Sequence, residues 1–183
     1  AAARQLVDPV WGGIYQYSTH GDWEHPHYEK LGQIQADYLR LFALGYAAFH
    51  DLEDLRVIRK LHTYLRTFLR SPEGAFFTSQ DADVRPGEKA TRYFTLSDAA
   101  RRREGIPRVD RHIYSRENGL IAAALVQAAL ATGDAGMLDD ARQAVNYILA
   151  QRGLPGGGFR HAAQDAAGPY LADNLAMLRA LLA

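Results

Sequence analysis

Residues 21 to 30, GDWEHPHYEK, combine side chains that could bind a metal or transfer a proton. His25, His27 and Glu29 alternate along the chain, and alternate residues of a β-strand share one face, so all three could ligate one metal ion. Pro26 and the apolar pattern that follows favour a helix that begins at Pro26, which puts the two histidines on different sides. We therefore favour a polar pocket without metal or other cofactor, with the metal site as an alternative.

His27 and Glu29 are the candidates for proton transfer in this stretch. Beside the partly positive end of a helix, a histidine can act as a general base or acid, and a carboxylate can orient it. We predict His27 and Glu29 as catalytic residues, together with Asp81 from a second polar cluster. In a hydrolase, two carboxylates such as Glu29 and Asp81 would carry the reaction. The alternative is a helix start whose polar side chains only satisfy neighbouring groups.

Two kinds of helix, which alternate along the chain, must position these residues. Inner helices are apolar on nearly every side, as expected for buried helices, whereas outer helices carry one apolar stripe. Asp51 and Asp134 precede the two outer helices and are predicted as N-caps. The predicted ranges are 29–49, 120–131 and 171–182 for the inner helices, and 51–69 and 134–151 for the outer helices.

A glycine-rich loop with an aromatic residue follows each outer helix. Phe76 and Phe159 lie in these loops, and their separation equals that of the two N-caps, since 159 − 76 = 134 − 51 = 83. A third copy, WGGIYQYS, precedes the first inner helix, and the aromatic residue that follows the glycines is predicted to enter the core. The repeating unit predicts one all-α domain over 1–183, an (α/α) toroid or an incomplete one, as part of a larger ring.

Polar clusters occupy the same place in each unit, between the loop and the next inner helix. In a ring of inner helices these ends would meet at one mouth of the central cavity. Carboxylates, amides and aromatic rings together suit a sugar, although each acid alone also suits capping or a turn. The predicted ligand-binding residues are Tyr17, Trp23, Lys30, Gln80, Asp83, Glu117, Asn118 and Asp173.

Composition excludes several classes of function. The 21 basic and 21 acidic residues cancel, which argues against nucleic-acid or membrane partners, and the basic run 101–103 is predicted to be a solvated face of a short helix after Ser97. The chain has no cysteine, so disulfides and thiolate sites are excluded. The longest apolar run, 120–126, is too short to span a bilayer, and no signal peptide is visible, so we expect a cytoplasmic protein.

Several of these motifs resemble one family. GGIYQYSTHGDWEHPHYEKL and SPEGAFFTSQDAD are similar to the helical region of thioredoxin-domain-containing proteins that include spermatogenesis-associated protein 20 and the YyaL-type proteins, as are RYFTLSDA, YSRENGLIAAAL and DAAGPYLADNLAMLRALL. The resemblance implies an (α/α) toroid of the six-hairpin glycosidase type, related in shape to N-acylglucosamine 2-epimerases. It also implies a thioredoxin-like domain, which we do not expect within this chain.

The family motifs carry over residue by residue only in part. Glu117 stands where the family usually has tryptophan, and Ile34 stands where it usually has aspartate. The leading hypothesis is a carbohydrate-active or carbohydrate-binding protein. Its expected activity is that of a sugar epimerase or isomerase, with a glycoside hydrolase as an alternative. The other alternative is a non-catalytic module that associates with a thioredoxin-like domain or with itself. The matching positions are Tyr17, Ser18, Trp23, Pro26, His27, Glu29, Lys30, Gln80, Asp81, Asp83, Asn118 and Gly119.

Overall fold

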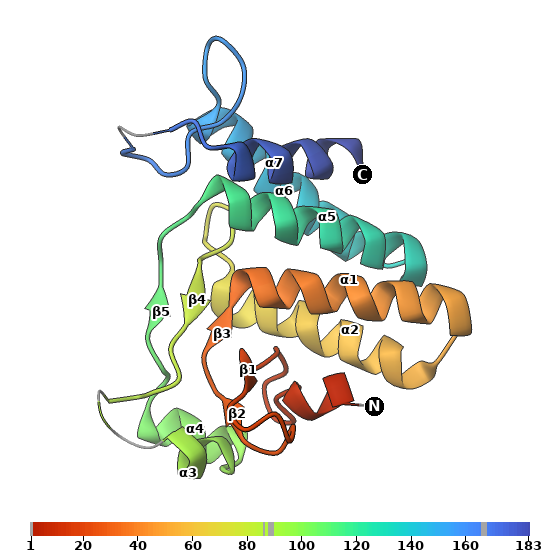
Figure 1. Ribbon diagram of the computed structural model, residues 1–183, viewed down its shortest axis with the longest axis vertical. Helices are drawn as coiled ribbons and strands as arrows, with labels where there is room; N and C mark the ends of the chain where they lie inside the picture. The colour runs from red at the N-terminus through yellow and green to blue at the C-terminus, as the bar shows by residue number, and fades with distance from the viewer. Residues whose placement is uncertain (1, 86, 88–89, 166–167) are drawn as a thin grey trace.

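The computed structural model describes residues 2–85, 87, 90–165 and 168–183. Its long helices form two layers (Figure 1). The inner layer holds α1 (Gly32–Phe49), α5 (Ser115–Thr132) and α7 (Leu171–Leu182), which run side by side in the same direction. The outer layer holds α2 (Leu52–Tyr64), which packs on α1, and α6 (Ala135–Arg152), which packs on α5. This alternation of inner and outer helices confirms the predicted all-α fold.

Both inner-to-outer connections use the same local chemistry. His50 at the end of α1 and Gly133 at the end of α5 adopt left-handed backbone conformations, which stop each helix. The Asp51 side chain then accepts a hydrogen bond from the second residue of α2, and Asp134 does the same for α6. The two predicted N-caps are confirmed. The predicted helix 51–69 continues beyond α2 as one π-helical turn, η2 (Leu65–Leu69).

The core lies between the two helical layers. Ile58 and Leu61 of α2 are fully buried, as are Leu39 of α1 and Leu125 of α5. Burial of each such side chain is worth about 1.5 to 3 kcal/mol. Gly119 allows α5 and α7 to approach closely, because a Cβ there would lie 2.6 Å from the α7 backbone.

Short strands occupy the chain where the sequence predicted the start of the first helix. β1 (Tyr17–Ser18) pairs with β2 (Pro26–His27) in antiparallel fashion, so the predicted helix start at Pro26 is wrong. The strand tolerates the proline because Gln16 and Thr19, which flank β1, donate to the carbonyls of His27 and His25, and this pairing requires no N–H at Pro26. The helix α1 begins at Gly32 instead of Glu29.

A second small sheet lies beside the N-terminal ends of the inner helices. Its strands are β3 (Lys30–Leu31), β4 (Ser79–Gln80) and β5 (Val109–Asp110), antiparallel and in the order β3–β4–β5. The sheet joins the segment that leads into α1 with the segments that follow η2 and precede α5 (Figure 1). Residues far apart in the sequence are therefore brought to one edge of the helical layers.

An amide side chain holds each glycine-rich loop to an inner helix. The amide oxygen accepts from the backbone N–H of the loop residue, and the amide nitrogen donates to the carbonyl of the same residue. We call these contacts amide clamps, and they confirm the predicted threefold repeat. The pairs are Gln35 on Ile14 (2.6 and 2.9 Å), Asn118 on Phe76 (2.7 and 3.0 Å), and Asn174 on Phe159 (2.9 and 3.5 Å).

A buried charge cluster joins the N-terminal segment to the short helices α3 (Ala90–Phe94) and α4 (Asp98–Glu104). Asp8 accepts from Lys30 Nζ and from Arg101 Nη1, each at 2.7 Å, and all three side chains are at most 1% exposed. The prediction that Arg101 faces solvent is therefore wrong, whereas Arg102 and Arg103 are exposed. Aromatic rings surround the cluster, including Trp11, whose ring centroid lies 5.0 Å from the Arg101 guanidinium carbon.

Burial changes the titration of this cluster. Desolvation lowers the pKa of Lys30 to about 8, although the Asp8 carboxylate opposes this shift. For Asp8 itself burial acts to raise the pKa, but the Lys30 charge and the hydrogen bonds from Arg101 and Lys30 outweigh it, so the pKa stays below its usual range. The charges of Lys30 and Arg101 are therefore compensated only while the Asp8 carboxylate is ionised.

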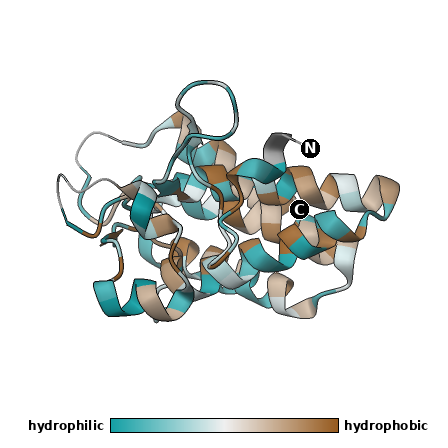
Figure 2. Ribbon diagram, turned by 90° about the horizontal axis from the view of Figure 1, so that it is seen from below, coloured by the Kyte–Doolittle hydropathy of each residue, from teal (hydrophilic) through white to brown (hydrophobic). Residues whose placement is uncertain are grey.

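Figure 2 shows hydrophobic residues concentrated on the helices and hydrophilic residues on much of the loop region. In the part of the chain that the structure describes, no helix is long and apolar enough to cross a membrane. One apolar row remains exposed on α7, where Leu171, Leu178 and Leu182 are 83%, 52% and 78% accessible.

Candidate functional site

The N-terminal ends of α1, α5 and α7 lie on one side of the molecule, next to the sheet β3–β4–β5 (Figure 1). We call this region the mouth. Helix N-termini carry partial positive charge, so groups that hold or develop negative charge are stabilised there. Two hollows adjoin the mouth, one beside the sheet and one along the inner helices.

The sheet-side pocket brings together two of the predicted catalytic residues. Its volume is about 140 Å³, and its lining includes Glu29, Asp81 and Asp110, with Ser79 and Arg108. The Asp81 backbone N–H donates to the Arg108 carbonyl at 2.8 Å, which fixes the strand segment beside Glu29. Burial acts to raise the pKa of Asp110, but hydrogen bonds from the following histidine outweigh it and hold that pKa below its usual range.

His27 lies close to Glu29 but does not form a short hydrogen bond with it. The distance from His27 Nε2 to Glu29 Oε2 is 3.6 Å, and the His27 ring stacks on Tyr17 at 5.1 Å between centroids. Trp23, with a backbone φ of 66°, lies in the connection between β1 and β2 and is 39% exposed. Tyr17 therefore borders His27 at the β1–β2 hairpin, Trp23 lies in its connection, and none of the three lines the sheet-side pocket.

The structure does not bring His25, His27 and Glu29 together, as the alternative metal site would require. His25 Nδ1 lies 2.6 Å from Asp22 Oδ2, away from His27 and Glu29. Among the described residues, the group of three histidine or acid side chains whose ligand atoms all lie within 4.8 Å of one another is His20, Asp22 and His25, all exposed. His25, His27 and Glu29 do not converge on one point, because His25 pairs with Asp22 whereas His27 lies beside Glu29.

Three of the buried ligand-binding candidates, Lys30, Gln80 and Asn118, form hydrogen bonds within the fold. Lys30 donates to Asp8 and to the Gly12 carbonyl, and Asn118 forms the clamp on Phe76. Gln80, 1% exposed, accepts from the Tyr64 hydroxyl. These hydrogen bonds hold the segments that border the mouth.

Asp83 lies apart from the other predicted residues. It lines a hollow of about 530 Å³ with residues of α3 and α4, including Tyr93 and Glu104. Its neighbour Asp81 faces the sheet-side pocket. The second predicted cluster is therefore divided between two hollows.

His161 and Asp173 form a histidine–carboxylate pair at the mouth. Asp173, 1% exposed, lies with Oδ1 3.0 Å from His161 Nδ1 and also accepts from the backbone N–H of Arg116 at 2.8 Å. The carboxylate thus holds the Nδ1–H tautomer of His161 and leaves Nε2 as an acceptor. The ring of His161 stacks on Tyr114 at 4.2 Å.

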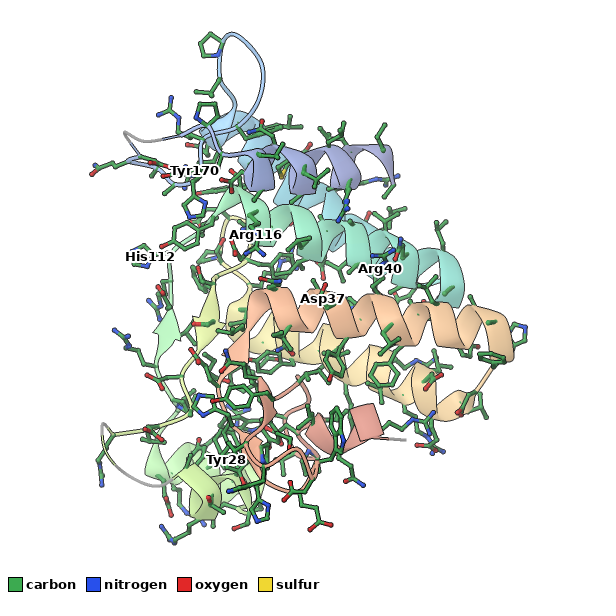
Figure 3. The ribbon with its side chains drawn as sticks, viewed as in Figure 1. Tyr28, Asp37, Arg40, His112, Arg116 and Tyr170 are labelled. Atoms are coloured by element: carbon green, nitrogen blue, oxygen red, sulfur yellow. The ribbon has the colours of Figure 1, made fainter. Side chains whose placement is uncertain are left out.

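A row of ring contacts at the mouth includes His161. His112 stacks on Tyr114 at 5.7 Å, Tyr114 stacks on His161, and Tyr170 meets His161 edge-on at 5.8 Å. Figure 3 shows His112 and Tyr170 beside the N-terminal ends of the inner helices. Flat rings of this kind can cover the C–H faces of a sugar.

The second hollow is a groove along the exposed face of the inner helices. It consists of two parts of about 310 and 380 Å³, which share Asp37 of α1, Leu120 of α5 and Arg179 of α7. These volumes lie within the range of about 300 to 1,000 Å³ that is usual for ligand sites. Figure 3 shows Asp37, Arg40 and Arg116 along the line where α1 and α5 meet. The polar side chains of the groove are Gln33, Asp37, Arg40, Arg116, Gln127 and Arg179.

Arg116 connects the groove to the buried acids. Its Nη1 donates to Glu117 Oε1 at 3.2 Å and its Nη2 to Gln33 Oε1 at 2.8 Å. Glu117 is 9% exposed, and among the described residues its Oε2 has no hydrogen-bond partner. Glu117 and Asp173 take equivalent places in the repeat, directly before the clamp asparagines, where the first unit has Ile34.

The sequence analysis did not select His161, Asp37, Arg40 or Arg179 as site residues. An available signal was the spacing of Gln33, Asp37 and Arg40, which places three polar residues on one face of a helix that otherwise reads as buried. The partner of His161 could not be inferred, because the loop that contains it has no periodic pattern.

Comparison with solved structures establishes the fold. Cellobiose 2-epimerase from Spirochaeta thermophila superposes with a TM-score of 0.74 over 97% of this chain, at 17% identity, and a sugar epimerase from a ruminal bacterium with 0.71 over 98%, at 18% identity. The fold is that of an α/α-toroid. An α-1,6-mannanase of Salegentibacter, crystallised with α-1,6-mannotriose, matches with a TM-score of 0.59 over 80% of the chain, at 20% identity. The chain covers 43% of each epimerase and 37% of the mannanase.

Sequence comparison supports the resemblance to spermatogenesis-associated protein 20. The rat protein is 27% identical over 99 residues, which are 51% of this chain, and the human protein is 29% identical over 85 residues, which are 44%. The matched stretch amounts to 12% and 10% of those proteins. No family model matches the chain.

Proposed function

We propose that this chain binds a carbohydrate at the mouth and along the groove, and acts on it by acid–base chemistry as an epimerase or isomerase does. The observation that carries the proposal is the His161–Asp173 pair, which stands in stacked aromatic rings beside a polar groove. The α/α-toroid fold, shared with two sugar epimerases, supports a carbohydrate as the ligand.

In the proposed reaction, His161 Nε2 removes the proton from the carbon next to the carbonyl of an open-chain sugar. Asp173 orients the ring and stabilises the imidazolium that forms. Return of a proton to the opposite face of that carbon gives the epimer. For this second proton transfer we propose Glu29 or Asp81, with His27 as their neighbour, from the sheet-side pocket.

Deuterium incorporation tests this proposal without knowledge of the natural substrate. The protein is incubated in heavy water with mannose, glucose and cellobiose, and loss of the C2–H signal is followed by proton NMR. We expect exchange with at least one sugar, and His161→Gln and Asp173→Asn to slow it by about 10²- to 10⁴-fold. His20→Gln, an exposed histidine on the β1–β2 hairpin, is the matched control and leaves the rate unchanged.

The outcomes separate the two candidate groups. Loss of exchange in Glu29→Gln or Asp81→Asn assigns the second proton transfer to the sheet-side pocket. Full activity in His161→Gln would show that His161 is not the base. Absence of exchange with every sugar would refute an epimerase acting on these sugars.

Hydrolysis is the second candidate, because Glu29, Asp81 and Asp110 place three carboxylates in one pocket and the fold is also that of α-1,6-mannanases. If the protein is a hydrolase, it releases reducing ends from α-1,6-mannotriose, and the Glu29→Gln and Asp81→Asn variants do not.

If the chain binds sugars but catalyses neither deuterium exchange nor hydrolysis, it is a binding module. For that case the exposed leucines of α7 favour a protein partner, and the sequence resemblance suggests a thioredoxin-like domain.

A further inference from the structure

We propose that the groove along the inner helices binds an anionic carbohydrate, one that carries a carboxylate or phosphate as well as hydroxyl groups. This inference rests on the proposed function and specifies its substrate class. Positive side chains outnumber negative ones in the groove, where Arg40, Arg116 and Arg179 stand against Asp37. A protein of zero net charge thus concentrates positive charge where the ligand would lie.

The guanidinium groups of Arg40 and Arg179 have no protein partner within the described chain. Within the described chain, neither forms a hydrogen bond or an ion pair, whereas the buried arginine Arg101 binds a carboxylate and two backbone carbonyls. Both free side chains line the same part of the groove. Both side chains are exposed, so their N–H donors are accessible to a ligand, and Asp37 is the acidic side chain in the same part of the groove.

The repeat explains how the two arginines come to flank one space. Each lies five residues after the clamp amide of its own unit, since 40 − 35 = 179 − 174 = 5. The equivalent residue of the central helix α5 is Ala123, which lines the groove between them. The small side chain of Ala123 leaves room above α5 for a ligand between the arginines of α1 and α7.

The guanidinium group fits an oxyanion better than a hydroxyl group. Its planar N–H donors match the two oxygens of a carboxylate or phosphate, and charge-assisted hydrogen bonds are about twice as strong as neutral ones. Arg116, in the first turn of α5, adds a third cation near the partly positive helix end. Together these groups select for negative charge on the ligand.

The groove also contains acceptors that suit hydroxyl groups. Asp37 has no partner in the described chain, and Gln127 Oε1 is buried without a hydrogen bond in the second part of the groove. Both can accept from sugar hydroxyls. Inorganic phosphate lacks the several hydroxyl groups of a sugar, so it cannot pair with these acceptors while it contacts the arginines, and it should therefore bind less tightly.

Calorimetric titration tests the inference with glucuronate, glucose 6-phosphate, glucose and inorganic phosphate as probes. We expect glucuronate, glucose 6-phosphate or both to bind at least about tenfold more tightly than glucose or inorganic phosphate. Comparison of the two anionic sugars shows whether the groove prefers a carboxylate or a phosphate. Arg40→Gln and Arg179→Gln each weaken the anionic sugar by at least about tenfold and leave glucose unchanged. Arg142→Gln, on the outer face of α6, is the control and changes no affinity.

Each other outcome overturns the inference. If glucose binds as tightly as its anionic derivatives, the groove does not select charge, although the carbohydrate function stands. If inorganic phosphate equals glucose 6-phosphate, the groove recognises an anion and not a sugar. If no probe binds, the groove is not an anionic sugar site, and the deuterium exchange experiment decides separately whether the proposed function stands.

Discussion

Removal of the Asp8 carboxylate should destabilise the protein more than any surface substitution. Asp8 is the carboxylate that neutralises two buried cations, Lys30 and Arg101, at 2.7 Å each. Breaking a buried ion pair from one side costs about 3 to 5 kcal/mol, and the Arg101 guanidinium cannot lose its proton to avoid that cost. Lys30 can lose its proton, which limits its share.

The share of Lys30 follows from its pKa. One pKa unit corresponds to about 1.4 kcal/mol, so lowering this pKa from 10.5 to about 8 already costs the charged lysine about 3 kcal/mol in the native protein. Without Asp8, we expect Lys30 to be neutral at about pH 7, at a total cost of about 5 kcal/mol, which adds about 1 to 2 kcal/mol. Asp8→Ala should therefore lower the free energy of unfolding by about 5 kcal/mol.

The pH dependence provides a sharper test than the magnitude. The folded-state pKa of Lys30 is lowered, so the folded protein binds fewer protons than the unfolded chain between about pH 8 and pH 10.5, and this group's contribution to stability rises with pH across that window. In the variant the rise begins at lower pH. The difference between variant and wild type should shrink by about 1 to 2 kcal/mol from about pH 7 to about pH 9.

Urea denaturation followed by circular dichroism measures these differences. Asp8→Asn, which keeps an acceptor oxygen, is the milder variant if Asp8→Ala does not fold. Asp139→Ala removes an exposed carboxylate that lies 3.6 Å from Arg142, and it should change stability little. A loss below about 1 kcal/mol for Asp8→Ala, or a loss that is independent of pH, would refute the reasoning.

Three further predictions concern the amide clamps, the close contact between α5 and α7, and a buried carboxylate. Asn118→Ala should cost about 3 kcal/mol, because it leaves a buried N–H and carbonyl unpaired, and Asn174→Ala should cost less because its clamp is longer and more exposed; equal losses in urea would contradict this. Gly119→Ala should lower the melting temperature by forcing a Cβ against the α7 backbone, whereas Gly156→Ala, which meets open space, should not. Asp140→Asn should cost about 3 kcal/mol in chemical denaturation, because that buried carboxylate joins His62 and arginines of η2 and the following residue; unchanged stability would argue against this role.

The helices and their repeat could be predicted because their signals are local. The N-caps Asp51 and Asp134 act within one turn of their own helices, and apolar periodicity reports which faces are buried. The two-residue strand at Pro26 could not be predicted in the same way, because its pairing partner sets it and its own sequence does not. Arg101 was misassigned for a related reason, since its partner Asp8 lies 93 residues earlier in the chain.

The candidate site was predictable only as a region. The repeat correctly placed Glu29 and Asp81 at the same pocket, because equivalent connections of a ring of helices meet on one side. It did not distinguish residues that face a ligand from residues that hold the loops. Lys30 and Asn118 are polar and lie next to the site, yet their side chains point into the protein, and only the tertiary contacts reveal this.

The amide clamps have a consequence for how such a site can change. Each clamp binds the N–H and carbonyl of a loop residue, which every amino acid except proline provides. The loop is therefore held in place whatever its side chains are. The clamped position already holds two residue types, isoleucine at Ile14 and phenylalanine at Phe76 and Phe159. Evolution, or a designer, can exchange neighbouring loop residues to alter specificity while the scaffold keeps its geometry.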